Sequence, residues 1–290
     1  MKPTTADMFE EAPAPEPDLP GVPTEAEITI DAPFGSLWAI HGLGGRVHRL
    51  AVVDATLQAA WERLMGERRA AVLLTDPPYN LAGNTAMRGV GKLRPKSYGE
   101  LKASEWDQDW NLEAFGAACA PYLATDCTAY LWTSHYLFGR AMAWVEGWAK
   151  HVQFACWEKN NPMPSLAKRY YTSAAELAVI GYRGAHTFHF PAQGHALNVF
   201  RFGRGGGNET AHPTQKPVDL FRHCLKHSAS PGTLVVDPHC GSGTAILAAE
   251  AERCECYAME IDPRWAGAIL TRCERAGMKA ERLAHVGTNA

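Results

Sequence analysis

From residue 36 onward, short apolar runs alternate with longer segments of helical periodicity. This alternation is typical of βα units whose strands lie side by side in a parallel sheet. The pattern predicts a single α/β domain with seven strands and six helices. The predicted strands lie at 50–53, 71–75, 128–132, 152–157, 177–182, 233–237 and 256–261, and the predicted helices at about 55–65, 112–121, 135–149, 217–228, 244–252 and 263–276.

Charge is distributed unevenly along the chain. Residues 1–31 hold one lysine against eight acidic residues, together with six prolines and few large apolar residues. Such a segment cannot bury enough apolar surface to offset its ordering entropy, so residues 1–33 are predicted to form a disordered acidic tail. The rest of the chain has 27 basic against 23 acidic residues, and this mildly basic domain, residues 34–290, allows a nucleic-acid partner.

Other classes of protein are excluded or disfavoured. No stretch approaches the roughly 18 consecutive apolar residues of a membrane span, and no secretory signal is visible, so a cytoplasmic protein is expected. The eight cysteines show no C-x-x-C spacing, which favours reduced and mostly buried thiols. His186, His189 and His195 lack a carboxylate or cysteine to complete a ligand set, so we expect ordinary polar histidines and no metal site.

Two long segments, residues 81–110 and 184–211, interrupt the alternation of strands and helices. Long irregular segments in compact domains are usually functional loops. Both combine basic residues with glycines, and the second is also rich in His and Phe, a mixture that fits contact with phosphates and bases. A solvated loop without a ligand is the alternative. The candidate DNA-binding residues are Arg88, Lys92, Arg94 and Lys96 in the first segment and Arg201 and Arg204 in the second.

The strongest local signal is the tetrapeptide Asp76-Pro77-Pro78-Tyr79, directly after the apolar run 71–75. The two prolines remove backbone donors, so this turn presents acceptors and suits an amino group. Hydrogen bonds from a nucleobase amine to the Asp76 carboxylate and the Pro77 carbonyl would favour a lone pair localised on nitrogen. Tyr79 offers an aromatic face on which a base swung out of its duplex could stack.

A second motif, Asp237-Pro-His-Cys-Gly241-Ser-Gly243-Thr244, ends one predicted strand and opens the next helix. Its two glycines allow close approach of the backbone to a ligand, and the helix N-terminus offers N–H groups to an anion. The spacing is not that of a phosphate-binding P-loop. About twenty residues further on, Glu260 ends another predicted strand, the position of the acid that binds ribose hydroxyls in nucleotide-binding folds. Together these features predict a nucleoside site.

The chain resembles the S-adenosylmethionine-dependent amino-methyltransferases of DNA. The resemblance covers about residues 36–276 and includes the segment His212-Pro-Thr-Gln-Lys216-Pro217, just before the glycine loop. The order of the motifs, with the catalytic half first, is similar to the β group of that family. It implies a Rossmann-like, seven-stranded, mostly parallel sheet with helices on both faces and a circularly permuted motif order.

The resemblance also implies roles for individual residues. Asp76, Pro77, Pro78 and Tyr79 match the catalytic tetrapeptide. The cofactor S-adenosylmethionine would be held at its methionine part by Asp237, Pro238, Gly241, Ser242, Gly243 and Thr244, at its methionine carboxylate by Thr214 and Lys216, at its ribose by Glu260, and at its adenine by Asp54. The chain departs from the family at His239, where Phe is usual, and at Val53, where Gly is frequent.

The activity expected from the resemblance is site-specific methylation of double-stranded DNA on the N6 amine of a flipped-out adenine, in the context of restriction–modification. Asp rather than Ser at position 76 resembles the adenine type. Cytosine-N4 methylation and a catalytically silent DNA-binding relative are the alternatives. Segment 184–211 would be a short target-recognition region, and members of the β group often form dimers, which allows a homodimer. Direct methyl transfer requires neither a metal nor a covalent nucleophile.

Overall fold

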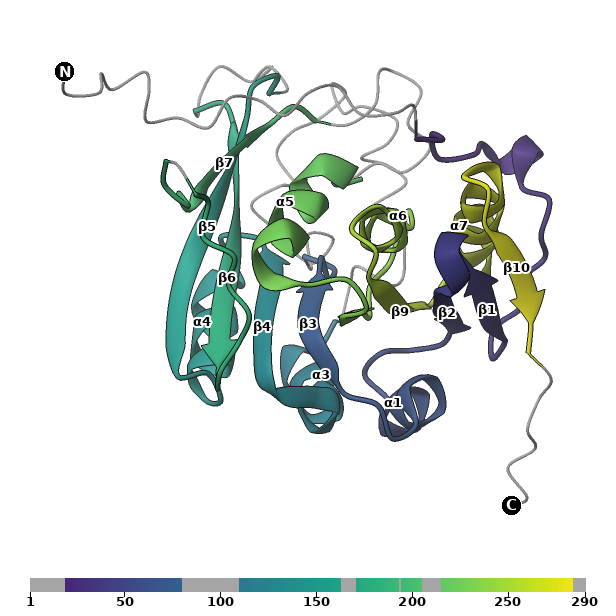
Figure 1. The fold of residues 1–290 in the computed structure, drawn as a ribbon, viewed down its shortest axis with the longest axis horizontal. Coiled ribbons are helices and arrows are strands. Elements are labelled where there is room, and N and C mark those ends of the chain that lie inside the picture. Colours follow the sequence, from purple (N-terminus) through teal and green to yellow (C-terminus); the bar gives the residue numbers. More distant parts are fainter. Residues whose placement is uncertain (1–18, 80–109, 163–170, 193, 205–214, 284–290) are drawn as a thin grey trace, which may run out of the picture.

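The computed structural model describes residues 19–79, 110–162, 171–192, 194–204 and 215–283. Ten strands of these residues form one mixed sheet in the order β10-β1-β2-β9-β8-β3-β4-β6-β5-β7 (Figure 1). The strands are β1 (Leu37–His41), β2 (Val47–Val52), β3 (Ala70–Thr75), β4 (Leu123–Thr133), β5 (His151–Lys159), β6 (Ala175–Arg183), β7 (Val199–Phe202), β8 (Leu234–Asp237), β9 (Glu255–Glu260) and β10 (Lys279–Arg282). The helices are α1 (Gln58–Met65), α3 (Leu112–Cys119), α4 (Phe138–Glu146), α5 (Val218–Ser228), α6 (Thr244–Ala251) and α7 (Pro263–Arg275).

The centre of the sheet is parallel and its two sides are not. Strands β2, β9, β8, β3 and β4 run parallel to one another, whereas β6 is antiparallel to both β4 and β5. On the other side, β1 is antiparallel to both β2 and β10. All seven predicted strands are present, and the structure adds β1, β7 and β10 at or near the edges. The predicted α/β class is confirmed, with a sheet of ten strands rather than seven.

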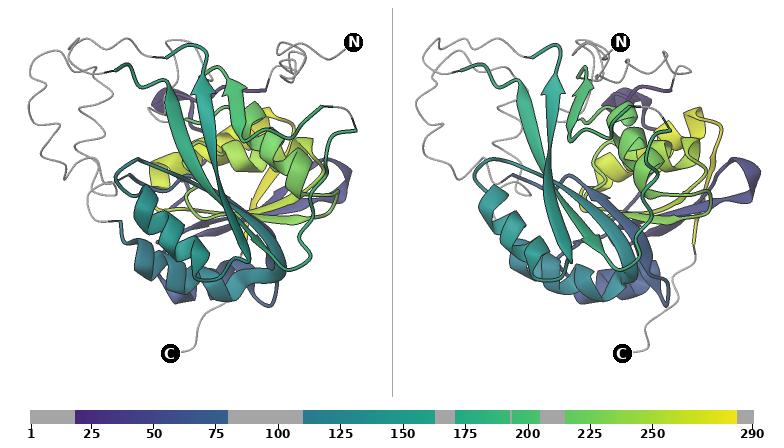
Figure 2. Two further views of the ribbon diagram at one scale, coloured as in Figure 1. Left: turned by 90° about the vertical axis from the view of Figure 1, so that its left-hand side faces the viewer. Right: turned by 60° about the vertical axis from the view of Figure 1, so that its left-hand side comes forward.

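Helices cover both faces of the sheet (Figure 2). Helices α5, α6 and α7 pack on one face, and α1, α3 and α4 pack on the other. The apolar central strands serve both layers because successive side chains point to opposite faces: Val72 and Leu74 belong to the first core and Leu73 to the second. Burial of a side chain such as Leu73 stabilises the fold by about 1.5–3 kcal/mol. This double burial fixes the register of β3, and therefore the position of the tetrapeptide that follows it.

Part of the predicted acidic tail packs onto the domain. The Thr29 N–H donates to the Thr271 hydroxyl at 3.1 Å, and Arg272 Nε donates to the Pro20 carbonyl at 2.8 Å. A Cβ at Gly267 of α7 would lie 2.5 Å from the Ile30 carbonyl oxygen, so the segment runs directly over this helix. Residues 19–33 thus belong to the folded body, and residues 1–18 lie outside the described residues.

Candidate functional site

Four acidic residues lie along one edge of the sheet. Asp54 follows β2, Glu260 ends β9, Asp237 ends β8 and Asp76 follows β3. These four strands are neighbours in that order and run parallel, so their carboxyl ends meet at the same edge. Ligands of open α/β sheets bind at this edge. The structure therefore brings together acids that are spread over 206 positions of the chain from Asp54 to Glu260.

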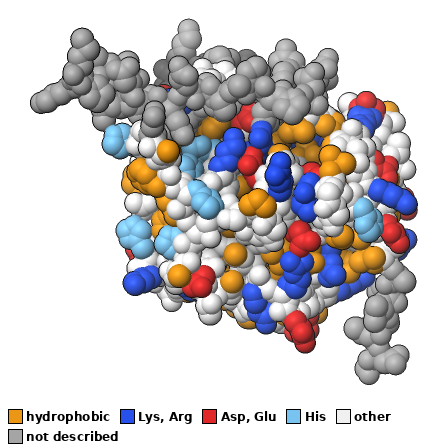
Figure 3. All heavy atoms as spheres, in the orientation of Figure 1, with side chains coloured by type: hydrophobic (Ala, Val, Ile, Leu, Met, Phe, Trp, Pro, Cys, Tyr) orange, Lys and Arg blue, Asp and Glu red, His pale blue; other side chains and the backbone are white. Residues whose placement is uncertain are grey.

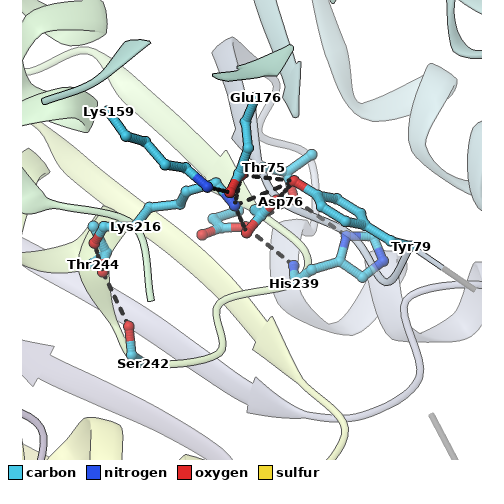
Figure 4. Close-up of polar contacts among 10 residues, drawn as sticks. Thr75, Asp76, Tyr79, Lys159, Glu176, Lys216, His239, Ser242 and Thr244 are labelled. Atoms are coloured by element: carbon cyan, nitrogen blue, oxygen red, sulfur yellow. Dashed lines mark hydrogen bonds and ion pairs between the residues drawn. The ribbon is translucent and has the colours of Figure 1, made fainter. Parts of the chain in front are cut away.

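Asp76 forms the centre of a compact polar cluster (Figure 4). Its Oδ1 accepts a hydrogen bond from the Tyr79 hydroxyl at 2.7 Å, and its Oδ2 pairs with Lys216 Nζ at 2.5 Å. Lys216 Nζ also lies 3.2 Å from the Tyr79 hydroxyl and 5.3 Å from the centre of the Tyr79 ring. The side chain of Lys216 is 4% exposed, and that of Asp76 is 17% exposed. The tetrapeptide is therefore held in place by a nearly buried ammonium group.

Glu176 and Lys159 extend this cluster and escaped prediction from the sequence. Glu176 Oε2 lies 2.9 Å from Lys216 Nζ, and Glu176 Oε1 accepts from Lys159 Nζ at 2.5 Å. Lys159 ends β5, and Glu176 lies near the start of β6. Their charges balance those of Asp76 and Lys216, two carboxylates against two ammonium groups. We call these four residues, with Tyr79, the charge cluster.

Burial and charge act in opposite directions on the pKa values of the charge cluster. Burial raises the pKa of Asp76, and the attraction of Lys216 offsets this effect only in part. Burial also acts to raise the pKa of Glu176, but the attraction of Lys216 and Lys159 is stronger and brings this pKa down to about 2. Burial acts to lower the pKa of Lys216, but Asp76 and Glu176 more than offset it, so the pKa is raised and the ammonium form is retained.

The glycine loop between β8 and α6 is anchored on both sides. The Gly241 N–H donates to Glu260 Oε2 at 2.8 Å, and Arg272 Nη1 donates to the Ser242 carbonyl at 2.8 Å. Gly243, the N-cap of α6, has a φ of 81°, a left-handed conformation that favours glycine. A Cβ there would also come within 3.2 Å of the side chain of Ile269. The loop can thus present its backbone to a ligand without side chains in the way.

Two acids beside this loop have pKa values raised to about 7 by burial. Asp237 accepts hydrogen bonds from the Thr75 hydroxyl at 2.9 Å and from the His239 N–H at 3.1 Å, which offset part of the effect. Glu260 accepts from the backbone N–H groups of Gly241 and of Asp262, the latter at 2.9 Å. Carboxyl groups whose pKa values are strongly raised by burial are typical of functional sites, and two of them lie together here.

Lys216 joins the two halves of the site. Its side chain bonds Asp76, and its backbone carbonyl accepts from the Thr244 hydroxyl, the first residue of α6, at 3.2 Å. The predicted partner of this lysine, a cofactor carboxylate, stays a prediction. Asp54 accepts from both the N–H and the hydroxyl of Thr56 at 2.8 Å. Thr214 lies outside the described residues.

The predicted DNA-binding residues are distributed differently. Arg201 lies on β7 and pairs with Glu158 of β5 at 3.0 Å. Arg204 lies just beyond β7, where its backbone N–H donates to Asn161 Oδ1 at 2.7 Å and its Nε donates to the Asn161 carbonyl at 2.8 Å. Both therefore belong to the β5–β7 side of the sheet, beyond the charge cluster. The other candidates, Arg88, Lys92, Arg94 and Lys96, lie outside the described residues.

Histidine side chains gather on the side of the molecule where β5, β6 and β7 lie (Figure 3). The ring of His186 lies 4.7 Å from that of Tyr182, and His189 Nε2 lies 3.1 Å from the Ser230 hydroxyl. Across the described part of the chain, no group of three or more His, Cys, Asp or Glu residues is arranged to hold a metal ion. Nor is any helix in those ranges long and apolar enough to span a membrane.

Comparison with known structures supports the fold. The M1.HpyAVI–SAM complex superposes with a TM-score of 0.58 at 22% identity, covering 77% of this chain and 97% of that one. The cytosine-N4-specific PvuII DNA methyltransferase superposes with a TM-score of 0.59 at 16% identity, covering 83% of this chain and 87% of that one. At these identities the likeness concerns the fold.

Comparison of sequences identifies the family. The Type II methyltransferase M2.MboI of Moraxella bovis is 26% identical over 199 residues, 61% of this chain and 70% of that protein. The Type II methyltransferase M2.LlaDCHI of Lactococcus lactis subsp. cremoris is 23% identical over 198 residues, which are 62% of this chain and 72% of that protein. The sequence model of the N6/N4 DNA methylases matches residues 70–269, which is more than half of the chain and includes both motifs. The chain therefore belongs to the N6/N4 DNA methylase family, whose members use S-adenosylmethionine as methyl donor.

Proposed function

We propose that this protein transfers a methyl group from S-adenosylmethionine to the exocyclic N6 amine of an adenine that is flipped out of double-stranded DNA. The observation that carries the proposal is the placement of Asp76 and Tyr79 beside the glycine loop, at the carboxyl edge of the sheet. An Asp at the first position of the tetrapeptide favours adenine over cytosine. The raised pKa of Asp76, caused by burial, is the kind of perturbation found at catalytic positions.

The transfer step requires an amine aligned with the methyl group, but neither a metal nor a covalent nucleophile. The amine nitrogen would attack the methyl carbon, so that the N–C bond forms as the C–S bond breaks, the cofactor departs as a neutral thioether, and the amine then releases one proton to solvent water. Asp76 already accepts bonds from Tyr79 and Lys216, but a carboxylate has about four lone-pair sites and so retains room for an N–H of the base. Its negative charge, held in a largely buried site, would stabilise the positive charge that develops on nitrogen.

The cofactor would occupy the row of acids. Its sulfonium and ammonium groups carry positive charge, which complements Asp237, and its ribose hydroxyls can donate to Glu260. The Gly241–Gly243 turn would border the methionine part of the molecule, and Asp54 would face the adenine. In this placement the residues that follow β3, among them Asp76, would lie next to the methionine part of the cofactor, because β8 and β3 are adjacent in the sheet.

DNA would approach from the same edge. Arg201 and Arg204 stand on the β5–β7 side, where they could contact phosphates next to the flipped base. Each phosphate contact should add to the salt dependence of binding, so replacing either arginine by alanine should reduce the slope of log K against log salt by about 0.9.

The test is the identity of the methylated nucleoside. Purified protein is incubated with unmethylated genomic DNA and labelled S-adenosylmethionine, and the DNA is digested to nucleosides for mass analysis, with the Asp76→Ala variant as control. N6-methyladenine that is absent from the control reaction supports the proposal. N4-methylcytosine would replace adenine by cytosine as the target, and no methylated nucleoside despite demonstrated cofactor binding would overturn the proposed activity.

A further inference from the structure

His239 connects three parts of the protein that are far apart in sequence. Trp110 Nε1 donates to His239 Nε2 at 2.9 Å, and His239 Nδ1 lies 3.1 Å from the Thr75 hydroxyl. The Thr75 hydroxyl in turn lies 2.9 Å from Asp237 Oδ1. The imidazole is packed between aromatic rings, with its centroid 5.0 Å from that of Phe115 and 5.4 Å from that of Trp110. Figure 4 shows the ring beside Thr75.

The chemistry of the partners determines the direction of each hydrogen bond. An indole N–H can only donate, so His239 Nε2 must be an acceptor and cannot carry a proton. The neutral ring then carries its proton on Nδ1, which donates to Thr75 Oγ1. The Thr75 hydroxyl has one proton, which it donates to Asp237 Oδ1. The result is a one-way chain from Trp110 through His239 and Thr75 to Asp237.

A charged imidazole would break this chain, because two N–H groups would then face each other at Nε2. Burial lowers the pKa of His239 to about 3, so the ring is neutral at physiological pH. The backbone N–H of His239 also donates to Asp237 Oδ1 at 3.1 Å. One residue thus contacts Asp237 directly through its backbone and indirectly through its ring.

We infer that His239 is a positioning residue whose Nδ1–H orients the Thr75 hydroxyl, so that Thr75 holds the Asp237 carboxylate for the cofactor. Thr75 ends β3 and directly precedes Asp76, so the same hydrogen bonds connect the glycine loop to β3 and to the tetrapeptide. The inference rests on the proposed role of Asp237 in cofactor binding. The ring does not need to touch the cofactor to act in this way.

Two amide substitutions distinguish the two hydrogen bonds of the His239 ring, the one from Trp110 and the one to Thr75. In His239→Asn the amide nitrogen can occupy the position of Nδ1 and still donate to Thr75, whereas in His239→Gln the amide oxygen can occupy the position of Nε2 and accept from Trp110. Calorimetric titration with S-adenosylmethionine should show affinity within about twofold of the wild type for His239→Asn. For His239→Gln it should fall by about tenfold, the usual effect of one lost buried hydrogen bond.

Steady-state kinetics should show the same split. His239→Gln raises KM for S-adenosylmethionine by about tenfold and changes kcat at saturation much less, whereas His239→Asn changes neither by more than about twofold. In a Thr75→Val background the difference between the two amides should vanish, because no hydroxyl remains to be oriented. Nitrogen-15 NMR of the histidine ring should show the proton on Nδ1. Far-UV circular dichroism confirms that each variant is folded.

Equal losses of affinity in the two amide variants, or a ring proton on Nε2, would overturn the inference. Asp237→Asn separates this failure from that of the proposed function. If Asp237→Asn weakens cofactor binding while His239→Gln does not, only the role of His239 is wrong. If Asp237→Asn also leaves the affinity unchanged, the proposed cofactor site itself is wrong.

Discussion

Replacing Glu176 by glutamine should expose the energetic role of the charge cluster. The substitution keeps the shape of the side chain and leaves two largely buried ammonium groups, Lys159 and Lys216, opposite Asp76 alone. The pKa of Glu176 falls from 4.5 to about 2, because the attraction of the two lysines outweighs burial. At about 1.4 kcal/mol per pKa unit, this shift corresponds to about 3 kcal/mol of native-state stability at neutral pH. Breaking a buried pair costs a similar 3–5 kcal/mol or so.

The control is Glu158→Gln. Glu158 lies on β5, and its partner is Arg201, but the two side chains are 50% and 46% exposed, so the loss should stay below about 1 kcal/mol. Unfolding free energies from urea titration at pH 7 compare the two variants with the wild type. A loss for Glu176→Gln no larger than that for Glu158→Gln would refute the reasoning.

The pH dependence provides a second check on the same residue. A carboxyl whose pKa is lowered on folding stabilises the native state above its unfolded pKa, here 4.5, and this contribution is lost as the pH falls toward about 2. The difference between wild type and Glu176→Gln should therefore be constant above about pH 5 and shrink below pH 4.5. A difference that grows on acidification would contradict the assigned direction of the shift.

Three further predictions concern the cofactor loop and the tetrapeptide. The pKa values of Asp237 and Glu260 are about 7, and the bound cofactor favours the ionised form of both carboxyl groups. The affinity for S-adenosylmethionine should therefore rise by about tenfold per carboxylate from pH 6 to 8. Calorimetry in buffers of different ionisation enthalpy measures the protons released on binding, and binding without proton release would contradict this prediction. Gly243→Ala should lower the free energy of unfolding by about 1–2 kcal/mol, because Gly243 has a φ of 81°. The control, Gly139→Ala, should not destabilise the protein, because nothing lies within 4 Å of the new Cβ. Tyr79→Ala should weaken the binding of DNA with an unpaired target base by about 1–3 kcal/mol, whereas Tyr79→Phe should retain the affinity of the wild type. Fluorescence anisotropy measures both affinities, and equal affinities of the Ala and Phe variants would exclude stacking on this ring.

The sequence predicts the central strands well because they have a simple physical signature. Strands such as β3 and β8 are buried on both faces and appear as continuous apolar runs. Two of the three strands that escaped prediction lack this signature: β10 reads Lys-Ala-Glu-Arg and is mostly exposed, and β7 has a single buried residue, Phe200. The third, β1, is an exception, because its Trp38, Ala39 and Ile40 form a short buried apolar run. Edge strands gain much of their stability from backbone pairing with a neighbour, which no pattern within the strand reveals.

The same distinction holds for the site. Asp76, Asp237 and Glu260 were predicted because each ends a recognisable strand, and parallel strands place their ends together. Glu176 and Lys159 come instead from antiparallel strands whose place in the sheet cannot be inferred from local sequence. In the sequence alone, His239 stands out only as a departure from the family. Its contact with Thr75 arises because β3 and β8 lie side by side, and its contact with Trp110 arises because the residues just before α3 pack against the glycine loop. Neither contact can be inferred from local sequence.

We propose above all that Asp76 acts in methyl transfer and not in holding the cofactor. The most direct measurement compares Asp76→Ala with the wild type in two assays, calorimetric binding of S-adenosylmethionine and single-turnover transfer of labelled methyl groups to DNA. We expect Asp76→Ala to bind the cofactor with an affinity within a few-fold of the wild type and to transfer methyl groups at least about 10³-fold more slowly, the scale of a lost electrostatic contact in a catalytic site. A variant that still methylates DNA at near the normal rate would contradict the proposal.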